Sequence, residues 1–274
     1  MQCITPIQVR NKTKDWAHQN LYSTVPCGSC VACLKRRAGH WSFRLNEEAK
    51  QSTSSAFLTL TYQTAPLSKN GRHTLVKKDF QNFLKRLRKL CPTNKLKYYA
   101  CGEYGSKTRR PHYHAIILNL PQSLIARPDK IESTWGHGHT MLTHSNQVTI
   151  NYVVGYMTKG RFEPDSPTDD RIKEFSLMSK KMGMNYLTPK MISYYKDRQV
   201  ACIVREGGQI ISMPRYYKEK IFTKEILKQI NKEFLRINQM KFDSQWINSQ
   251  HELSFKKQLI AKNKKEQLLK RQAI

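Results

Sequence analysis

The chain has little negative charge and no long apolar run. Of its 274 residues, 20 are Asp or Glu and 48 are Lys or Arg, which gives a formal net charge of +28 at pH 7. Such an excess favours a polyanionic partner, either a nucleic acid or an anionic membrane. The apolar run Ala115–Leu118 has the length of a strand, and no run approaches the roughly 20 residues that span a bilayer. Nucleic acid is therefore the expected partner, and no membrane is expected.

Three further features are missing. The sequence has no Gly-rich nucleotide loop, no internal repeat and, in its opening stretch MQCITPIQVRNKTK, no apolar signal-peptide core. We therefore expect the chain to stay in the cytoplasm where it is made. The seven cysteines are an odd number, and in a reducing compartment they are more typical of metal ligands or buried thiols than of disulfides.

Strand and helix patterns alternate along the chain. Alternating or β-rich runs predict strands at 57–62, 96–103, 112–118 and 140–143, and a hairpin from 201–204 and 209–212. Apolar residues at helical spacing predict helices at 34–50, 77–90, 123–135 and around Tyr152. We expect residues 1–33 to be irregular, and the chain from Lys218 onward to be helical with thin apolar faces. This order predicts an α+β fold, an antiparallel sheet with packed helices. The expected segments are a Cys-rich segment with a basic helix (1–50), a core (51–215) and a basic helical tail (216–274).

Two histidines share one face of a predicted strand. Residues i and i+2 of a strand point the same way, so His112 and His114 project together while Tyr113 faces the other side. The turn before this strand should fold Glu103 back beside His112, which would complete a divalent metal site with a carboxylate. An isolated His-x-His pair is more often two half-exposed strand residues. The nearby glutamate, the basic turn and the downstream tyrosines favour the metal site here.

A second pair, His137 and His139, is flanked by glycines. Flanking glycines are typical of a turn or a strand entry and not of a rigid platform. We therefore rank this pair well below His112 and His114.

Two tyrosines lie one helical turn apart. Tyr152 and Tyr156 are neighbours on one face of the predicted helix, and Lys159 follows on the same side. Tyrosines at this spacing often only pack against a sheet. A phenol, with a pKa of about 10, attacks a phosphodiester when a cation stabilises the phenolate and a metal polarises the phosphate. Lys159 and the histidine site could supply both.

Several motifs together resemble a known family. They are Val25–Arg37 with its three cysteines, Phe57–Tyr62, Gly102–Gly105 leading into Arg110–His114, the Tyr-x-x-x-Tyr-x-x-Lys helix, and Phe175–Lys180. Over roughly residues 1–200 the chain resembles the HUH-superfamily replication initiators of microviruses of the gokushovirus type, which are small single-stranded DNA phages.

The resemblance implies a rolling-circle nickase with an HUH endonuclease core, ferredoxin- or RRM-like, acting in the cytoplasm of a bacterial host. It implies that His112, His114 and Glu103 bind Mg²⁺ or Mn²⁺, and that Tyr152 or Tyr156 forms a 5′-phosphotyrosine link at the phage origin. A 3′-OH is left for synthesis, and the displaced strand is later rejoined into a circle. The expected partners are origin DNA and the host polymerase and helicase. The expected DNA contacts are Lys85, Arg86, Lys107, Arg109 and Arg110.

The chain departs from the family pattern at two positions. Tyr113 stands where an aliphatic residue is usual, a mild change because its ring can still pack inward. Gly155 stands where the family often has lysine, which removes a cation and loosens the helix between the tyrosines. Tyr156, whose partner Lys159 is intact, is therefore the expected first nucleophile.

Three cysteines follow a tight spacing, Cys27-x-x-Cys30-x-x-Cys33, and Cys3 could fold back as a fourth thiolate. Four thiolates suit a structural Zn²⁺, an iron–sulfur cluster is the rival, and free thiols at a helix start are equally compatible with the spacing.

Two other functions fit part of the pattern. A transposase or relaxase would use the same chemistry, although the phage-like cysteine motif argues against it. A non-catalytic basic protein would bind nucleic acid through Lys and Arg alone, with the histidines structural. Formation of a covalent adduct with DNA separates the enzymes from the binding protein.

Overall fold

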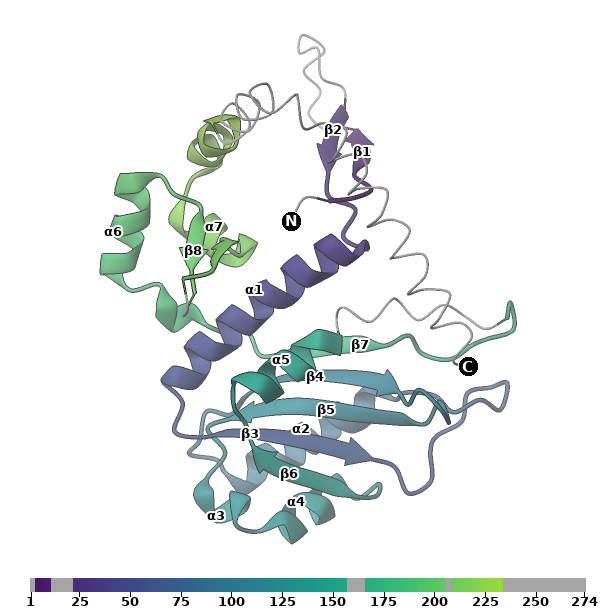
Figure 1. The fold of residues 1–274 in the computed structure, drawn as a ribbon. Helices are drawn as coiled ribbons and strands as arrows, with labels where there is room; N and C mark the ends of the chain where they lie inside the picture. Colours follow the sequence, from purple (N-terminus) through teal and green to yellow (C-terminus); the bar gives the residue numbers. More distant parts are fainter. Residues whose placement is uncertain (1–2, 11–21, 157–165, 206–207, 234–274) are drawn as a thin grey trace. The chain divides into compact units, whose positions relative to one another are not determined.

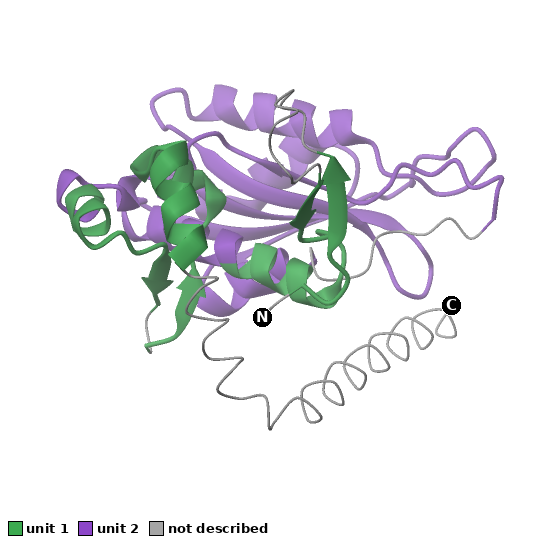
Figure 2. Cartoon of the chain, turned by 90° about the horizontal axis from the view of Figure 1, so that it is seen from above, with its two compact units in different colours: residues 1–39, 192–272 green, residues 40–191, 273–274 purple. Residues whose placement is uncertain are grey.

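The computed structural model describes residues 3–10, 22–156, 166–205 and 208–233. The chain divides into two compact units, one of residues 1–39 and 192–272 (unit 1) and one of residues 40–191 and 273–274 (unit 2). Figure 2 draws unit 1 in green and unit 2 in purple. The three segments expected from the sequence remain a prediction.

Unit 2 is built on a five-stranded sheet whose order is β6-β3-β5-β4-β7 (Figure 1). Every neighbouring pair is antiparallel. The strands are β3 (Ser55–Thr61), β4 (Lys97–Tyr104), β5 (Pro111–Leu118), β6 (Thr140–His144) and β7 (Phe175–Met178). The predicted α+β class is confirmed, and β7 is a strand that the sequence patterns did not predict.

The helix α2 (Lys77–Leu90) covers one face of this sheet with the boundaries predicted from its periodicity. Its apolar stripe, Phe80, Phe83, Leu84 and Leu87, is buried in the main core. From the sheet, Tyr113 of β5 packs against Phe80, with ring centroids 5.6 Å apart. Side chains of odd-numbered β5 residues near Tyr113 therefore face α2, which leaves His112 and His114 on the opposite face.

The opposite face carries α5 (Gln147–Gly155). Asn146 begins this helix with a capping box, in which its side chain accepts from the Thr149 N–H and its own N–H donates to the Thr149 hydroxyl. The helix ends at Gly155. Tyr156 follows as its C-cap and keeps helical backbone angles, φ −59° and ψ −26°. Both tyrosines therefore lie on one helical run, as predicted.

The helix predicted at 123–135 is wrong in one respect, because it is two helices. They are α3 (Gln122–Ile125) and α4 (Pro128–Trp135). Pro128 has no N–H to donate, and its ring disfavours helical angles at the residue before it. Arg127 accordingly has φ −125° and ψ 69°, which ends the first helix.

A long helix, α1 (Val31–Lys50), begins in unit 1 and ends in unit 2. It starts three residues before the predicted Leu34. In unit 2 a short 3₁₀ turn, η2 (Met184–Tyr186), packs near it, with the Tyr186 ring edge-on to Phe43 at 4.9 Å between centroids.

Unit 1 contains two hairpins. The predicted one is confirmed as β8 (Cys202–Val204) paired with β9 (Ile210–Ser212). The other, β1 (Ile7–Arg10) with β2 (Tyr22–Val25), lies where irregular chain was expected, so that expectation was wrong for these residues.

Helices α6 (Pro189–Arg198) and α7 (Arg215–Ile221) flank the β8–β9 hairpin in sequence. α7 buries Tyr217 and Ile221, and Phe222 after it is buried too, so the thin apolar face expected from Lys218 was wrong at this point. Residues 224–233 are helical, and the predicted tail beyond them lies outside the described residues. Across the described helices, none is long and apolar enough to cross a membrane.

Candidate active site

The pairing of β4 with β5 brings an acid beside the two histidines. Glu103 stands opposite His112 in the register, and Cys101 stands opposite His114. The connecting turn closes with a hydrogen bond from the Gly105 N–H to the Arg110 carbonyl, 3.0 Å. The sequence predicted this fold-back of Glu103, and the structure has it.

The three side chains converge on one point. The Glu103 Oε1 atom lies 2.7 Å from His112 Nε2 and 3.4 Å from His114 Nε2. Glu103 and His114 are buried, with 5% and 7% of their surfaces exposed, while His112 is half-buried. The three ligand atoms lie within 4.8 Å of one another. Two imidazoles and one carboxylate form a donor set that fits a divalent cation and leaves positions open for phosphate oxygens or water.

Hydrogen bonds on the far side of each ring orient the histidines. His112 Nδ1 lies 3.1 Å from the Arg110 carbonyl, which only accepts, so Nδ1 carries the proton and Nε2 is left to bind an ion. His114 Nδ1 lies 3.0 Å from the Thr59 hydroxyl. Thr59 was missed from the sequence, although it pairs with His114 across β3 and β5.

Tyr113 packs on the other side of the sheet, as its position between the histidines predicted. It is fully buried, and its hydroxyl donates to the Val76 carbonyl (2.8 Å) and accepts from the Val76 N–H (3.0 Å). The same hydroxyl lies 2.8 Å from that of Tyr62. Burial raises the pKa of Tyr113 to about 12, so this phenol is a structural group.

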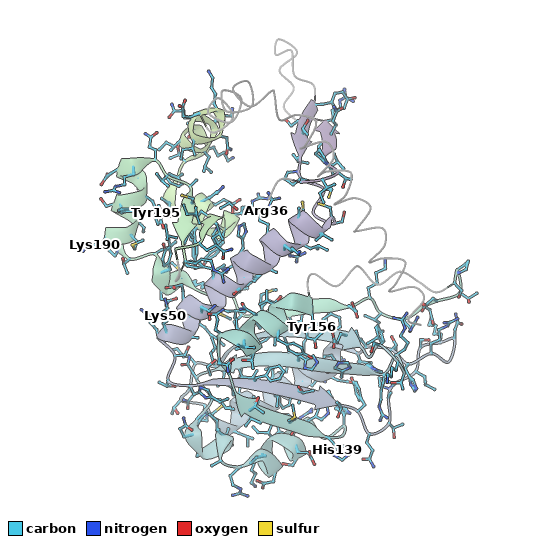
Figure 3. All side chains as sticks on the ribbon, viewed as in Figure 1. Arg36, Lys50, His139, Tyr156, Lys190 and Tyr195 are labelled. Carbon is cyan, nitrogen blue, oxygen red and sulfur yellow. The ribbon has the colours of Figure 1, made fainter. Side chains whose placement is uncertain are left out.

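Both candidate nucleophiles lie against His114. The Tyr156 ring stacks on it with centroids 5.0 Å apart and planes at 4°, and the Tyr152 ring meets it at 5.6 Å and 74°. The two phenol rings are 5.0 Å apart (Tyr156 is labelled in Figure 3). Tyr152 is 53% exposed, whereas Tyr156 is half-buried. The helix therefore presents both hydroxyl-bearing rings to the histidine site.

The surroundings of Tyr156 disfavour its phenolate in the metal-free chain. Burial, a hydrogen bond with Tyr152 and the negative charge of Glu103 raise the pKa of Tyr156 well above its usual range. Lys159, the cation predicted to offset such effects, lies outside the described residues.

The predicted DNA contacts fall into two groups. Lys107, Arg109 and Arg110 lie on the β4–β5 turn, beside the histidine strand. The Arg110 guanidinium donates to the carbonyls of Tyr62 and Gln63, which anchors that turn to the chain after β3.

Lys85 and Arg86 lie on α2, which covers the face opposite the histidines. Arg86 donates to the carbonyls of Thr134 (2.8 Å) and Trp135 (2.9 Å), at the end of α4. The structure does not bring these two residues together with the site, and their contact with DNA stays a prediction.

The lower-ranked histidines are not part of the cluster. His137 and His139 lie in the loop before β6, and His139 Nδ1 is 3.9 Å from a Glu132 carboxylate oxygen (Figure 3). Gly138 between them has φ +149°, a conformation that suits a tight turn. Among the described residues, the groups that could hold a metal are Glu103 with His112 and His114, and the four cysteines of unit 1.

Comparisons with known proteins agree with the resemblance seen in the sequence motifs. Residues 55–161 match a family model for the replication-associated protein ORF2, a span that holds both histidines, Glu103 and both tyrosines. The replication-associated protein ORF2 of Spiroplasma virus 4 is 27% identical over 257 residues, which cover 81% of this chain and 80% of that protein.

Two further phage proteins match. The replication-associated protein VP4 of Bdellovibrio phage phiMH2K is 27% identical over 80% of this chain and 76% of its own length. The replication-associated protein ORF4 of Chlamydia phage 1 is 25% identical over 71% of this chain and 53% of its own length. No solved structure matches significantly. These relatives confirm the resemblance to phage replication initiators.

Proposed function

We propose that this chain, a relative of phage replication-associated proteins, starts rolling-circle replication by nicking the phage origin through a tyrosine nucleophile. The observation that carries the proposal is the contact of Tyr152 and Tyr156 with His114, beside the Glu103–His112 pair. Nucleophile and metal-ligand side chains from one segment of chain, residues 103–156, thereby meet on one face of an HUH-type sheet. The related proteins supply the replication context.

The chemistry is a transesterification at phosphorus. The phenol oxygen of one tyrosine loses its proton to solvent and forms a bond to the phosphorus, while the bond from phosphorus to the 3′ oxygen breaks. The 3′ oxygen takes up a proton and becomes the 3′-OH that primes synthesis, and the 5′ phosphate stays joined to the protein. A divalent cation, Mg²⁺ or Mn²⁺, held by Glu103, His112 and His114 supplies charge neutralisation at the phosphate oxygens.

Two tyrosines allow the strand to be rejoined. One tyrosine holds a 5′ end, the other attacks the regenerated origin, and the freed 3′-OH then attacks the first phosphotyrosine to close a single-stranded circle. We assign the first attack to Tyr156 because its ring lies face-on to His114 and Lys159 follows it at helical spacing. Tyr152, the more exposed of the two, takes the second.

The basic turn between β4 and β5 is proposed to hold the DNA backbone. Lys107 and Arg109 lie between Glu103 and His112 in the sequence, on the turn that joins the two strands of the metal ligands. Contacts of this kind bind phosphates and carry no sequence information by themselves. We propose host polymerase and helicase as further partners, and the cytoplasm of the bacterial host as the place of action.

A nicking assay with histidine variants tests the proposal. His112→Ala and His114→Ala should each abolish Mn²⁺-dependent cleavage of a single-stranded origin oligonucleotide and leave its binding nearly unchanged, because affinity comes mainly from Lys and Arg. His139→Ala, a histidine outside the cluster, is the matched control and should cleave normally. Full cleavage by the double alanine variant, or in excess chelator, would contradict the proposal and favour a non-catalytic binding protein.

A further inference from the structure

Unit 1 contains four cysteines gathered at the start of α1. Their Sγ atoms lie within 4.8 Å of one another. Cys3 Sγ is 3.6 Å from Cys27 Sγ and 3.8 Å from Cys30 Sγ, and Cys33 lies buried in the first turn of the helix. All four thiols are free. Cys3 and Cys27 are 24 residues apart in the sequence, so the cluster depends on how the intervening chain folds.

The spacing of the sulfurs fits a single tetrahedral ion. Four sulfurs at about 2.3 Å from a zinc ion lie about 3.8 Å from one another. The two measured separations match this edge length. An iron–sulfur cluster places several irons and inorganic sulfides between its thiolates, and so spreads the sulfurs further than this cluster does.

Donors surround the sulfurs as they do thiolates. The Cys27 N–H donates to Cys3 Sγ and the Cys30 N–H donates to Cys27 Sγ, each at 3.3 Å. The Thr5 hydroxyl also donates to Cys27 Sγ, at 3.4 Å. Arg36, labelled in Figure 3, places its guanidinium 3.6 Å from Cys33 Sγ. Four thiolates around a divalent ion carry a net charge of about −2, which Arg36 and the positive end of the α1 dipole offset.

The β1–β2 hairpin has little else to hold it. Each strand has four residues, and every side chain is exposed except that of Val25, which is half-buried. Ile7, Val9 and Tyr22 are 46–57% exposed. A two-stranded hairpin without a buried face is marginal in water. Cys3 precedes β1 and Cys27 follows β2, so the cysteines close the base of the hairpin, where its two ends meet α1.

We propose that Cys3, Cys27, Cys30 and Cys33 bind one Zn²⁺ ion as a structural site that fixes the β1–β2 hairpin to the first turn of α1. The site is independent of the proposed nicking chemistry, because all four ligands lie in unit 1 and the histidine site lies in unit 2. Its formation is coupled to folding of this segment, as in other small zinc-stabilised motifs.

Metal content of the purified full-length chain tests the proposal. Cys30→Ser should lose about one zinc equivalent per chain relative to the unmutated protein. The matched control is Cys202→Ser, since Cys202 is a half-buried cysteine of the same unit outside the cluster, and it should keep its zinc. Equal zinc content in the two variants would overturn the site, and iron with acid-labile sulfide, or a disulfide found by mass spectrometry, would overturn its chemistry.

Hydrogen exchange on the unmutated protein gives a second measurement that does not depend on a variant folding. A strong chelator should remove amide protection from residues 7–10, 22–25 and the first turns of α1, while β3 and β5 stay protected. Added Zn²⁺ should restore it, and tetrahedral Co²⁺ should give the absorption typical of thiolate ligation. Unchanged protection of the hairpin after the metal has been removed would overturn the structural role.

Discussion

Thr59 offers a test of how the metal ligands are oriented. Its hydroxyl lies 3.0 Å from His114 Nδ1, on the side of the ring away from Glu103. Thr59→Val replaces this hydroxyl with a methyl group of similar shape and leaves the Nδ1–H without its acceptor. Loss of such an outer partner typically costs 10–100-fold in metal affinity, about 1.4–2.7 kcal/mol.

The structure favours the lower end of that range. Thr59 is half-buried, so water can take the place of its hydroxyl, and the Phe57 ring still stacks on His114 with centroids 5.6 Å apart. We therefore expect Mn²⁺ affinity to fall by about tenfold, ~1.4 kcal/mol, and the Mn²⁺ concentration needed for nicking to rise by the same factor.

Calorimetric titration with Mn²⁺ in the absence of DNA measures this effect without relying on catalysis. Thr61→Val is the matched control, because Thr61 lies two residues along the same strand and its hydroxyl donates to the His139 carbonyl at 3.1 Å. The control should bind Mn²⁺ as the unmutated chain does. Unchanged affinity in Thr59→Val, or an equal loss in Thr61→Val, would refute the reasoning.

Three further outcomes follow from the fold. Tyr113→Phe should lower the free energy of unfolding in urea by about 1–3 kcal/mol, because both backbone groups of Val76 lose their buried partner, while Mn²⁺ affinity stays unchanged. Gly138→Ala should cost more than about 1 kcal/mol, since its Cβ would overlap the backbone nitrogen of Gln63 at φ +149°; thermal melting checks it. Truncation after residue 233 should weaken DNA binding and flatten its salt dependence but spare nicking of short oligonucleotides; an unchanged salt slope would mean that the tail does not contact DNA.

Where one face of an element is buried, the sequence pattern predicted it well. The period of α2 is set by four buried apolar residues against a charged outer face, and its predicted boundaries are those observed. Strand alternation likewise placed His112 and His114 together and Tyr113 inward, because the sheet is covered on both sides.

Elements without a strong buried face were missed. β1 and β2 are exposed, and β7 is half-buried along its whole length, so none gives a clear alternation of buried and exposed residues. The position of Thr59 opposite His114 depends on the register of β3 with β5, and periodicity within one strand does not fix the register between two. The sulfur cluster similarly depends on the return of Cys3 across the hairpin, which spacing alone left open.

The central claim is that Tyr152 and Tyr156 attack DNA, and one measurement tests it most directly. The chain is incubated with Mn²⁺ and an origin oligonucleotide labelled on the 3′ side of the nick, and the labelled protein is digested and mapped by mass spectrometry. We expect the DNA-linked peptide to contain residues 152–156, Tyr156→Phe to lose more adduct than Tyr152→Phe, and the double variant to form none. Equal loss in the two single variants would remove only the ranking. An adduct on another residue, or label retained by the double variant, would contradict the account.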